Sequence, residues 1–535
     1  MTEATLSPDT GAGTAHPRRW AILGVLILAL FGLSLDNTIL TIALPTLARD
    51  LSATAADLQW IVDAYILVFA GLLLLAGALS DRYGRRLMLL IGLALFGIGS
   101  ALTPLVHTSE QLIALRAFMG LGAALMMPST LSIIADVFPA HERPRAIAAW
   151  GSVSALGIVA GPLIGGWLLE HFAWPAVFLI NVPAVIVGIV ATLAVVPESR
   201  APGRVRLDLV GAGLSVIGLS TLVFAIIEAP SRGMGDPSVV VAGTVSAIAI
   251  VAFILWERHT AHPMLDVRLF RDRRFSAASL SVALVFFALM GALFFLTQYL
   301  QGVQGLSAFQ TGLRFIPVAI GVMLASMASA TLTVRLGARF AVTLGLVVTA
   351  IGLAALVLVR VDTPDLFIAV EMFIVAAGIG LAMTPATDAI MSALPAAQFG
   401  VGSAVNDTTR EIGGALGIAI LGSLFAGAYA SHMSDVAKLL PADVAAVVTD
   451  SLAGAAAVAE RVGGEAGARL LAVAQQAFVD AMGWTSLIGA AVALGGAAIA
   501  FIWLPGKRRA AAQAPDAEAP AARPTPTSRP VYDAD

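Results

Sequence analysis

An aspartate, Asp36, lies inside the first long apolar stretch of the chain, residues 20–44. A charged group within a membrane-spanning helix costs about 2.5–3.5 kcal/mol on insertion scales, so Asp36 is a functional candidate. Arg116 lies in another apolar stretch, residues 111–138. If these two helices run in opposite directions, the helical rise places Asp36 about 12 Å and Arg116 about 7 Å from the same surface. Their depths therefore allow contact.

Such a pair suits proton coupling. A guanidinium beside a carboxylate favours the charged form, and moving the guanidinium away lets the carboxylate take up a proton. Asp63, near the outer end of the stretch at 58–79, is a second coupling candidate. Two alternatives stay open: Asp36 and Arg116 form a permanent ion pair that holds two helices together, and Asp63 is only a solvated carboxylate.

A further charged group starts a helix in the segment GVGSAVNDTTREIGGALG, residues 400–417. Asp407 and Glu411 are four residues apart and Arg410 is three after Asp407, so all three share one face. The group is either an entry site for cations or a salt-bridged helix start. Gln298, in the stretch at 276–300, is another candidate for lining a ligand cavity.

Other chemistries are excluded by composition. The chain has no cysteine, which removes disulfides, thiolate metal sites and cysteine nucleophiles. The seven histidines all fall between the apolar stretches, so we expect no metal site. No GxxxxGK[ST] phosphate loop occurs, which excludes driving by ATP within this chain. We therefore expect no enzyme activity, no catalytic residues and no cofactor, and with a net charge of −3 no nucleic-acid partner.

The elements that must position these residues are membrane helices. Of the 535 residues, 59% are hydrophobic and only 12% are charged, with a mean hydropathy of +0.91. Soluble domains carry about 25% charged residues, so the sequence predicts an all-α integral membrane protein. Apolar windows of about 19 residues predict fourteen spans, near 20–44, 58–79, 87–105, 111–138, 146–169, 174–196, 208–228, 238–256, 276–300, 311–333, 339–360, 365–391, 402–429 and 482–504.

Arginine fixes the expected orientation. Arginines gather before residue 20 and around 82–86, 143–145, 200–206, 258–274 and 335–339, whereas the short loops of the other side hold only Arg49, Arg232 and Arg360. The positive-inside rule then places both termini in the cytoplasm. We expect a multi-pass protein of the bacterial inner membrane.

An internal repeat divides the chain. GLGAALMMPST (120–130) is similar to AGIGLAMTPAT (377–387), which pairs the fourth span with the twelfth. This predicts two six-helix bundles plus an inserted helix pair, a transporter plan. The expected parts are a cytoplasmic segment at 1–19, the first bundle at 20–200, inserted helices seven and eight with a cytoplasmic loop at 201–274, and the second bundle at 275–505. Residues 430–481 form an external loop, either a helical hairpin or a spacer, and 506–535 a disordered cytoplasmic tail.

Two glycine-containing motifs remain. GALSDRYGRR joins the second and third spans and supplies Gly77, Asp81, Arg82, Gly84, Arg85 and Arg86. Positive-inside anchoring explains its arginines but not its spaced glycines and aspartate, so we interpret it as a gating latch. GIVAGPLIGG in the fifth span supplies a stripe for close helix packing, made of Gly157, Gly161, Pro162, Gly165 and Gly166.

Together these motifs resemble the major facilitator superfamily, in particular its fourteen-span drug:proton antiporter branch, which includes quaternary-ammonium multidrug exporters. In that family the first motif lies in the loop between helices two and three, and the second marks exporters. Arg116 matches the family's arginine motif. Relatives that export cations carry acidic residues in the region of Asp407 and Glu411.

The resemblance implies a monomeric, proton-coupled antiporter that exports amphipathic, cationic organic compounds from the cell. Its partners would be the substrate, protons and the lipid bilayer. The proton-coupling residues would be Asp36, Arg116 and Asp63, and the recognition residues Asp407, Glu411, Arg410 and Gln298. Two alternatives stay open: a dedicated exporter of one endogenous metabolite, antibiotic or lipid, and a non-transporting membrane sensor or scaffold.

Overall fold

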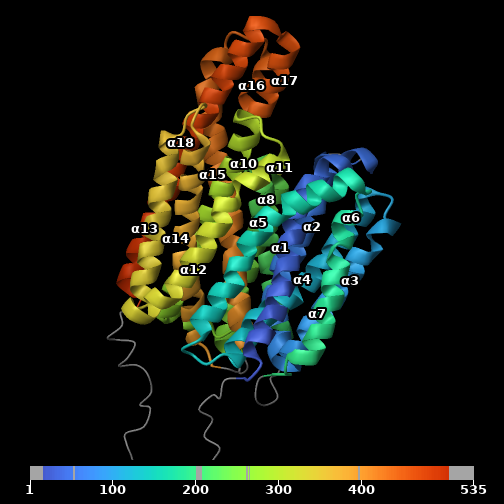
Figure 1. The fold of residues 1–535 in the computed structure, drawn as a ribbon, viewed down its shortest axis with the longest axis vertical. Helices are drawn as coiled ribbons and strands as arrows, with labels where there is room; N and C mark the ends of the chain where they lie inside the picture. Colours follow the sequence, from blue (N-terminus) through green and yellow to red (C-terminus); the bar gives the residue numbers. More distant parts are fainter. Residues whose placement is uncertain are drawn as a thin grey trace, which may run out of the picture.

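The structure is a computed structural model that describes residues 16–51, 53, 55–200, 208–260, 263, 265–395 and 398–504. Every regular element in this part of the chain is a helix, and most of the long helices stand side by side (Figure 1). Apolar runs form helices in lipid because a helix satisfies all of its backbone hydrogen bonds internally. The expected tail at 506–535, residues 1–15 and the loop residues 201–207 lie outside the described residues.

The first half of the chain supplies seven α-helices: α1 (Arg19–Asp50), α2 (Ala55–Tyr83), α3 (Arg85–Leu102), α4 (Ser109–Val137), α5 (Arg143–His171), the short α6 (Ala176–Leu179) and α7 (Asn181–Val195). The inserted pair is α8 (Leu209–Arg232) and α9 (Pro237–His259), followed by the short helix η2 (Val267–Arg271).

The second half begins with α10 (Arg273–Gln298), a π-helical turn η3 (Tyr299–Val303), α11 (Ala308–Arg314) and α12 (Ile316–Leu336). It continues with α13 (Ala338–Ala355), α14 (Asp365–Ser392), α15 (Phe399–Ala437), α16 (Ala442–Asp450), α17 (Leu452–Val462) and α18 (Gly464–Trp503). The short helices η1 (Thr103–Leu105) and η4 (Leu356–Leu358) end α3 and α13.

Within the described residues, 13 helices are long and apolar enough to cross a membrane. Helix α5, which has 29 residues, lies against α1 and α12 and occupies the place of the remaining span. Each of the fourteen predicted spans therefore corresponds to a helix, and the all-α membrane architecture is confirmed.

The two halves repeat one packing pattern. In the first half α2 packs on α4, α3 on α4, α1 on α5 and α3 on α7. In the second half α12 packs on α14, α13 on α14, α10 on α15 and α13 on α18, in the same order. Across the halves, α2 meets α15 and α5 meets α12, which are equivalent pairs. The inserted helices α8 and α9 pack on each other, and α8 also contacts α2 and α15.

The same tight turn precedes α3 and α13. Gly84 has φ +123° and Gly337 has φ +91°, and each is the residue before its helix. A side chain is disfavoured in this part of backbone space, so glycine is required at both turns. The turn reverses the chain between α2 and α3 and between α12 and α13.

The expected external loop, residues 430–481, is helical. The ends of α15 and α18 continue beyond the other helices, and α16 and α17 close them into a cap (Figure 1). The Tyr429 hydroxyl on α15 donates a hydrogen bond to the Val448 carbonyl at 3.3 Å and fixes α16. Gly463 and Gly464 both have positive φ and end the helical path between α17 and α18.

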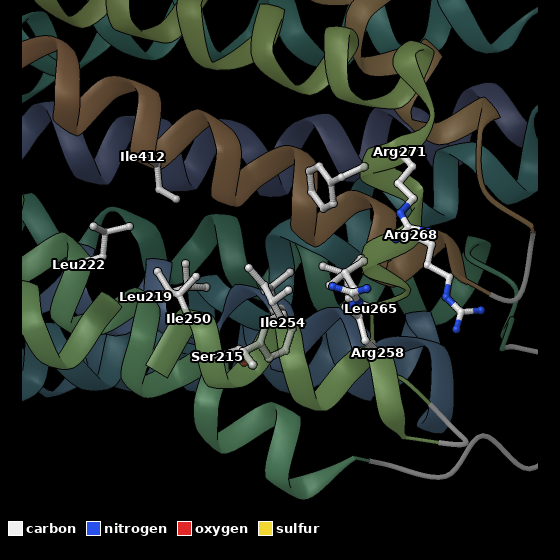
Figure 2. A pocket seen from close by; sticks show the side chains of 14 residues that line it. Ser215, Leu219, Leu222, Ile250, Ile254, Arg258, Leu265, Arg268, Arg271 and Ile412 are labelled. Carbon is white, nitrogen blue, oxygen red and sulfur yellow. The ribbon is translucent and has the colours of Figure 1, made fainter. Parts of the chain in front are cut away.

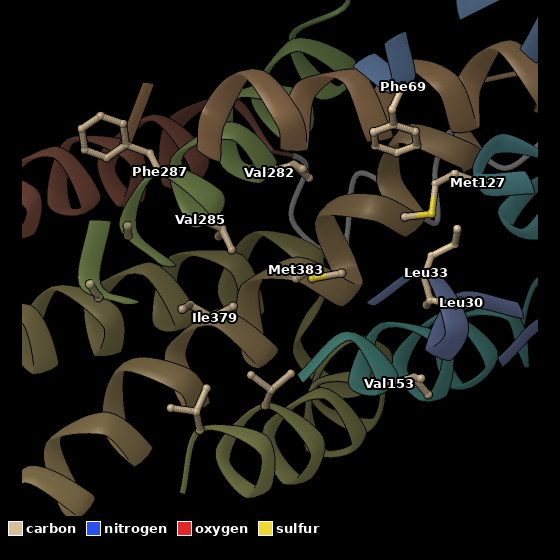
Figure 3. Close-up of a cluster of buried hydrophobic side chains, with 14 of the residues drawn as sticks. Leu30, Leu33, Phe69, Met127, Val153, Val282, Val285, Phe287, Ile379 and Met383 are labelled. Atoms are coloured by element: carbon tan, nitrogen blue, oxygen red, sulfur yellow. The ribbon is translucent and has the colours of Figure 1, made fainter. Parts of the chain in front are cut away.

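The buried core runs through both halves and along their interface. Figure 3 shows Leu33 and Met127 from the first half facing the space toward Met383 and Ile379 of α14. These four side chains also line the central cavity described below. The interface between the halves therefore encloses a cavity with an apolar wall.

Candidate functional site

Asp36 and Arg116 form a buried ion pair between α1 and α4. Arg116 Nη1 donates to Asp36 Oδ2 at 2.6 Å, and Asp36 is 0% exposed. Asn181, at the start of α7, donates from Nδ2 to the other carboxylate oxygen at 2.9 Å. The guanidinium also donates from Nε to the Ile61 carbonyl at 3.1 Å, and it stacks on the Tyr65 ring at 4.2 Å. Thus Asp36 has a charged partner and a neutral one.

The glycine stripe of α5 holds α1 in place beside this pair. A Cβ on Gly157 would lie 2.5 Å from the Ser34 Cβ, and a Cβ on Gly165 2.6 Å from the Ile39 Cγ1. A Cβ on Gly161 would overlap Thr38, whose hydroxyl donates to the Gly157 carbonyl at 2.8 Å. Close helix approach needs residues without side chains at such positions. The three glycines therefore set the position of the helix that carries Asp36.

The other two residues of the motif stand apart from this contact. The nearest atom to a Cβ on Gly166 is Phe309 Cδ2 at 3.9 Å, so Gly166 is not part of the α1 contact. The side chain of Pro162 lies outside the described residues.

A cavity of about 680 Å³ lies between the two halves. Arg116 and Asp63 line it from the first half, whereas Asp36 is shielded behind Arg116. Most of the wall is apolar, and it includes aromatic rings from both halves: Tyr65, Phe69, Phe286 and Phe315. Ligand sites typically combine an apolar wall with a few polar groups, as here.

The second half contributes Arg410 and Glu411 to the cavity wall. The Arg410 guanidinium lies 4.5 Å from the Phe286 ring centroid and 3.7 Å, measured from Nη1, from Asp407 Oδ1. Asp407 is buried on the far side, where Asn406 Nδ2 donates to it at 3.2 Å. Each half thus places an arginine at the cavity with an aspartate behind it.

The GALSDRYGRR motif fastens the two halves at one end. Asp81 Oδ1 accepts from the Gly400 backbone N–H at 2.8 Å, and Oδ2 accepts from the Val401 N–H at 3.1 Å. These are free N–H groups of the first turn of α15, where a negative charge is favoured. Gly77 allows this approach, since a Cβ there would lie 2.5 Å from the Gly400 carbonyl oxygen.

The arginines of the motif have different partners. Arg85 is buried and donates to Asp81 at 3.2 Å, and it pairs with Asp136 of α4 at 3.2 Å. Arg86 donates to the Leu193 carbonyl of α7 at 3.0 Å, within its own half. Arg82 stacks on its neighbour Tyr83 at 5.1 Å. Arg85 therefore supports the link to α15, whereas the hydrogen bond of the Arg86 side chain and the ring contact of Arg82 lie within the first half.

Two of the predicted recognition residues, Gln298 and Asp407, do not line the cavity. Gln298 does not point into the cavity: its amide donates to the Phe294 carbonyl at 3.4 Å, and the cavity is lined by Thr297 and Gln301 instead. The lining residues Leu293, Thr297 and Gln301 are spaced by four, so Gln298 falls on the neighbouring helix face. Of the two acids on this face of α15, Glu411 lines the cavity, whereas Asp407 lies beside Arg410 and does not. Asn181 was not predicted as a site residue. Its one sequence signal is its place just before Val182 and Pro183, where a proline marks a helix start.

Comparison with known proteins gives consistent matches. The family model described as Major Facilitator Superfamily matches residues 26–418. The multidrug efflux pump LfrA of Mycolicibacterium smegmatis is 37% identical over 498 residues, 93% of this chain and 98% of that protein. The tetracenomycin C resistance and export protein of Streptomyces glaucescens is 31% identical and covers 98% of this chain and 99% of its own. The solved proton:xylose symporter XylE has a TM-score of 0.58 at 15% identity, covering 91% of this chain and 96% of its own.

Proposed function

The chain belongs to the major facilitator superfamily, and from this membership we propose that it is a proton-coupled antiporter that exports amphipathic, cationic organic compounds across the cytoplasmic membrane. The relatives at 37% and 31% identity carry names of efflux and resistance proteins. The observation that carries the proposal is the buried Asp36–Arg116 pair at the wall of a cavity between two repeated bundles.

The coupling step follows from the pair's geometry. With Asp36 charged, Arg116 is held at 2.6 Å and faces the cavity. A proton on Asp36 removes the Coulombic attraction, so Arg116 is released to a different partner and the packing of α1 on α4 loosens. Loss of that proton restores the pair. Binding and release of one proton therefore bias two arrangements of the bundles, as alternating access requires.

The energy suffices for efflux. One charge moved through 100 mV supplies about 2.3 kcal/mol, so one proton at ordinary membrane energies supports a gradient on the order of a hundredfold. No cofactor and no ATP are needed. Protons and the substrate are the proposed partners, the protein is proposed to act as a monomer, and both termini are proposed to face the cytoplasm.

Inside-out vesicles test this proposal. Vesicles that contain the protein and are acidified inside are expected to take up ethidium and to release it when an uncoupler collapses the gradient. Vesicles with Asp36→Asn at matched expression are the control for leakage. Uptake that requires ATP and ignores uncouplers would overturn the proposal.

A second candidate, export of one antibiotic or metabolite, is favoured by the relative named for tetracenomycin C. The same vesicles distinguish the two. A multidrug exporter is expected to move several unrelated dyes, and each should compete with ethidium. A dedicated exporter would move none of them and would respond only to its own compound.

A further inference from the structure

A second cavity, of about 500 Å³, opens on the outer face of the helix bundle beside the inserted pair. Its apolar walls come from α2, α8, α9 and α15, and include Leu74, Leu219, Ile250, Ile254 and Ile412. Ile254 and Phe270 are exposed at its edge. Because these side chains face the place where lipid surrounds the bundle, the cavity is a groove that opens toward lipid tails.

Three arginines close one end of this groove. Figure 2 shows Arg258, Arg268 and Arg271 together at one end, with Leu222 and Ile412 at the opposite, apolar end. Arg258 comes from the last turn of α9, and the other two come from η2. All three side chains are exposed. The groove therefore has an apolar end and a cationic end.

Arginines outnumber acids around this end of the groove: residues 257–274 contain five arginines and three acids, Glu257, Asp266 and Asp272. In the described part of the chain, none of the three forms an ion pair within 4 Å. The neighbouring carboxylates serve the backbone instead: Asp266 accepts from the Arg268 N–H at 2.9 Å, and Asp272 from the Arg274 N–H at 2.8 Å. In the described residues, three guanidinium groups without an ion-pair partner thus lie at the end of an apolar groove.

We propose that this groove binds an anionic phospholipid, with an acyl chain between α8, α9 and α15 and the phosphate held by Arg258, Arg268 and Arg271. A long chain fills the apolar end, and guanidinium groups bind phosphate with well-matched donors. A cationic export substrate is excluded from this groove because three arginines repel it. Basic pockets between helices on the cytoplasmic side attract anionic headgroups in this way.

The lipid would act on the inserted pair. Helix α8 contacts both α2 and α15, the helices that the Asp81 contacts fasten across the halves. A chain lodged between α8–α9 and Ile412 of α15 therefore fills the space beside a moving interface. The inference rests on the proposed function in one respect. The arginine end is placed on the cytoplasmic side because both termini are proposed to face the cytoplasm.

Native mass spectrometry of the purified full chain tests the proposal without any transport assay. The protein is titrated with phosphatidylglycerol and with phosphatidylcholine that has the same acyl chains. We expect clear preference for phosphatidylglycerol. The triple variant Arg258→Gln, Arg268→Gln, Arg271→Gln is expected to bind it about a hundredfold more weakly, since each arginine near a membrane surface contributes about a factor of five.

A matched triple variant controls for net charge. Arg145→Gln, Arg200→Gln and Arg273→Gln remove three other exposed arginines that do not line the groove, and binding is expected to stay unchanged. Ile254→Trp, which obstructs the apolar part and keeps all arginines, is expected to weaken binding as well. If the groove triple variant does not fold, the single variants replace it, each with a loss of about fivefold.

Three results would overturn the proposal. Phosphatidylglycerol binding that survives the groove variants would place the lipid elsewhere. Equal binding of phosphatidylcholine would make the groove a non-selective lipid surface. Competition by soluble glycerol phosphate at concentrations similar to the lipid would identify a site for a free phosphate. Because the readout is bound lipid, a failure here leaves the transport proposal untouched, and the reverse also holds.

Discussion

Asp81 and Gly400 are 319 residues apart in sequence and are joined by a hydrogen bond of 2.8 Å between a carboxylate and a backbone N–H. The same carboxylate accepts from Val401, so one side chain caps the first turn of α15 from the end of α2. This contact joins the end of α2 in the first half to the start of α15 in the second, and we propose that it opens when the halves separate at this end.

Asp81→Asn removes the charge and turns an amide N–H toward one of the two backbone donors. Hydrogen bonds to a charged group contribute about 1.5–3 kcal/mol, so the closed arrangement should lose about tenfold or more in population. We expect dye efflux to fall strongly while expression and membrane insertion stay normal. Arg82→Gln, in the same motif but without a partner on α15 in the described residues, should be much milder. Normal efflux by Asp81→Asn would assign the motif to topology alone.

Asp36→Asn is expected to abolish efflux of every substrate, because proton coupling serves them all. Removing one member of a buried pair leaves an uncompensated charge on Arg116, at a cost of about 3–5 kcal/mol. The measurement compares one cationic and one neutral dye at matched expression. Selective loss of the cation would show that Asp36 binds the ligand instead of the proton.

Glu411→Gln should impair the cationic dye and spare the neutral one, because Glu411 lines the cavity and acts only through attraction to a positive ligand. Asp407→Asn should affect both dyes, because Asp407 acts through the position of Arg410. The same pair of efflux assays decides between these roles. An equal loss of both dyes in Glu411→Gln would remove it from substrate recognition.

Asn181→Ala removes the neutral partner of Asp36, whose Oδ1 then has no donor from α7. Such a loss typically costs about 1–3 kcal/mol, which corresponds to about a fivefold or greater loss of efflux for both dyes. Asn181→Ala should therefore resemble a weaker form of Asp36→Asn in its substrate profile. A cation-selective defect in efflux would contradict this positioning role.

Gly161→Ala and Gly166→Ala differ by their neighbours alone. The first forces a methyl group into Thr38 and Ile39 of α1, whereas the second meets its nearest atom at 3.9 Å. Overpacking costs about 1–3 kcal/mol, so only Gly161→Ala should lower both the thermal stability of the purified protein and its efflux. Equal behaviour of the two variants would show that the stripe does not determine the α1–α5 contact.

The sequence predicted the features that depend on a single helix, namely its span and the depth of its charged residues. Apolar length predicted every span, and the fixed rise per residue predicted depths for Asp36 and Arg116 that allow contact. The sequence did not predict contacts that depend on which helices lie side by side. Asn181 meets Asp36 only because α7 packs on α1, and the donors for Asp81 are backbone groups on a helix of the other half.

Which residues of one helix face the cavity also depends on how that helix packs, as Gln298 and Asp407 show. The cavity-lining residues of α10 follow regular helical spacing, Phe286, Leu289, Met290, Leu293 and Thr297, and this spacing leaves Gln298 on a different face of the helix. Asp407 and Glu411 share a helix face by spacing, yet only Glu411 reaches the cavity, since Asp407 is enclosed by Asn406 and Arg410.

The matching turns before α3 and α13 bear on how the molecule evolved. Residues 80–86 read SDRYGRR and residues 333–339 read TVRLGAR, with Gly84 and Gly337 in register. The duplicated turn has kept its glycine and two of its arginines, but Val334 stands where the first copy has Asp81. The two turns thus share their backbone conformation but not the negative charge of Asp81. The carboxylate that joins the two halves is present at one of the two equivalent turns and replaced by an apolar side chain at the other, so the two repeats are joined unequally.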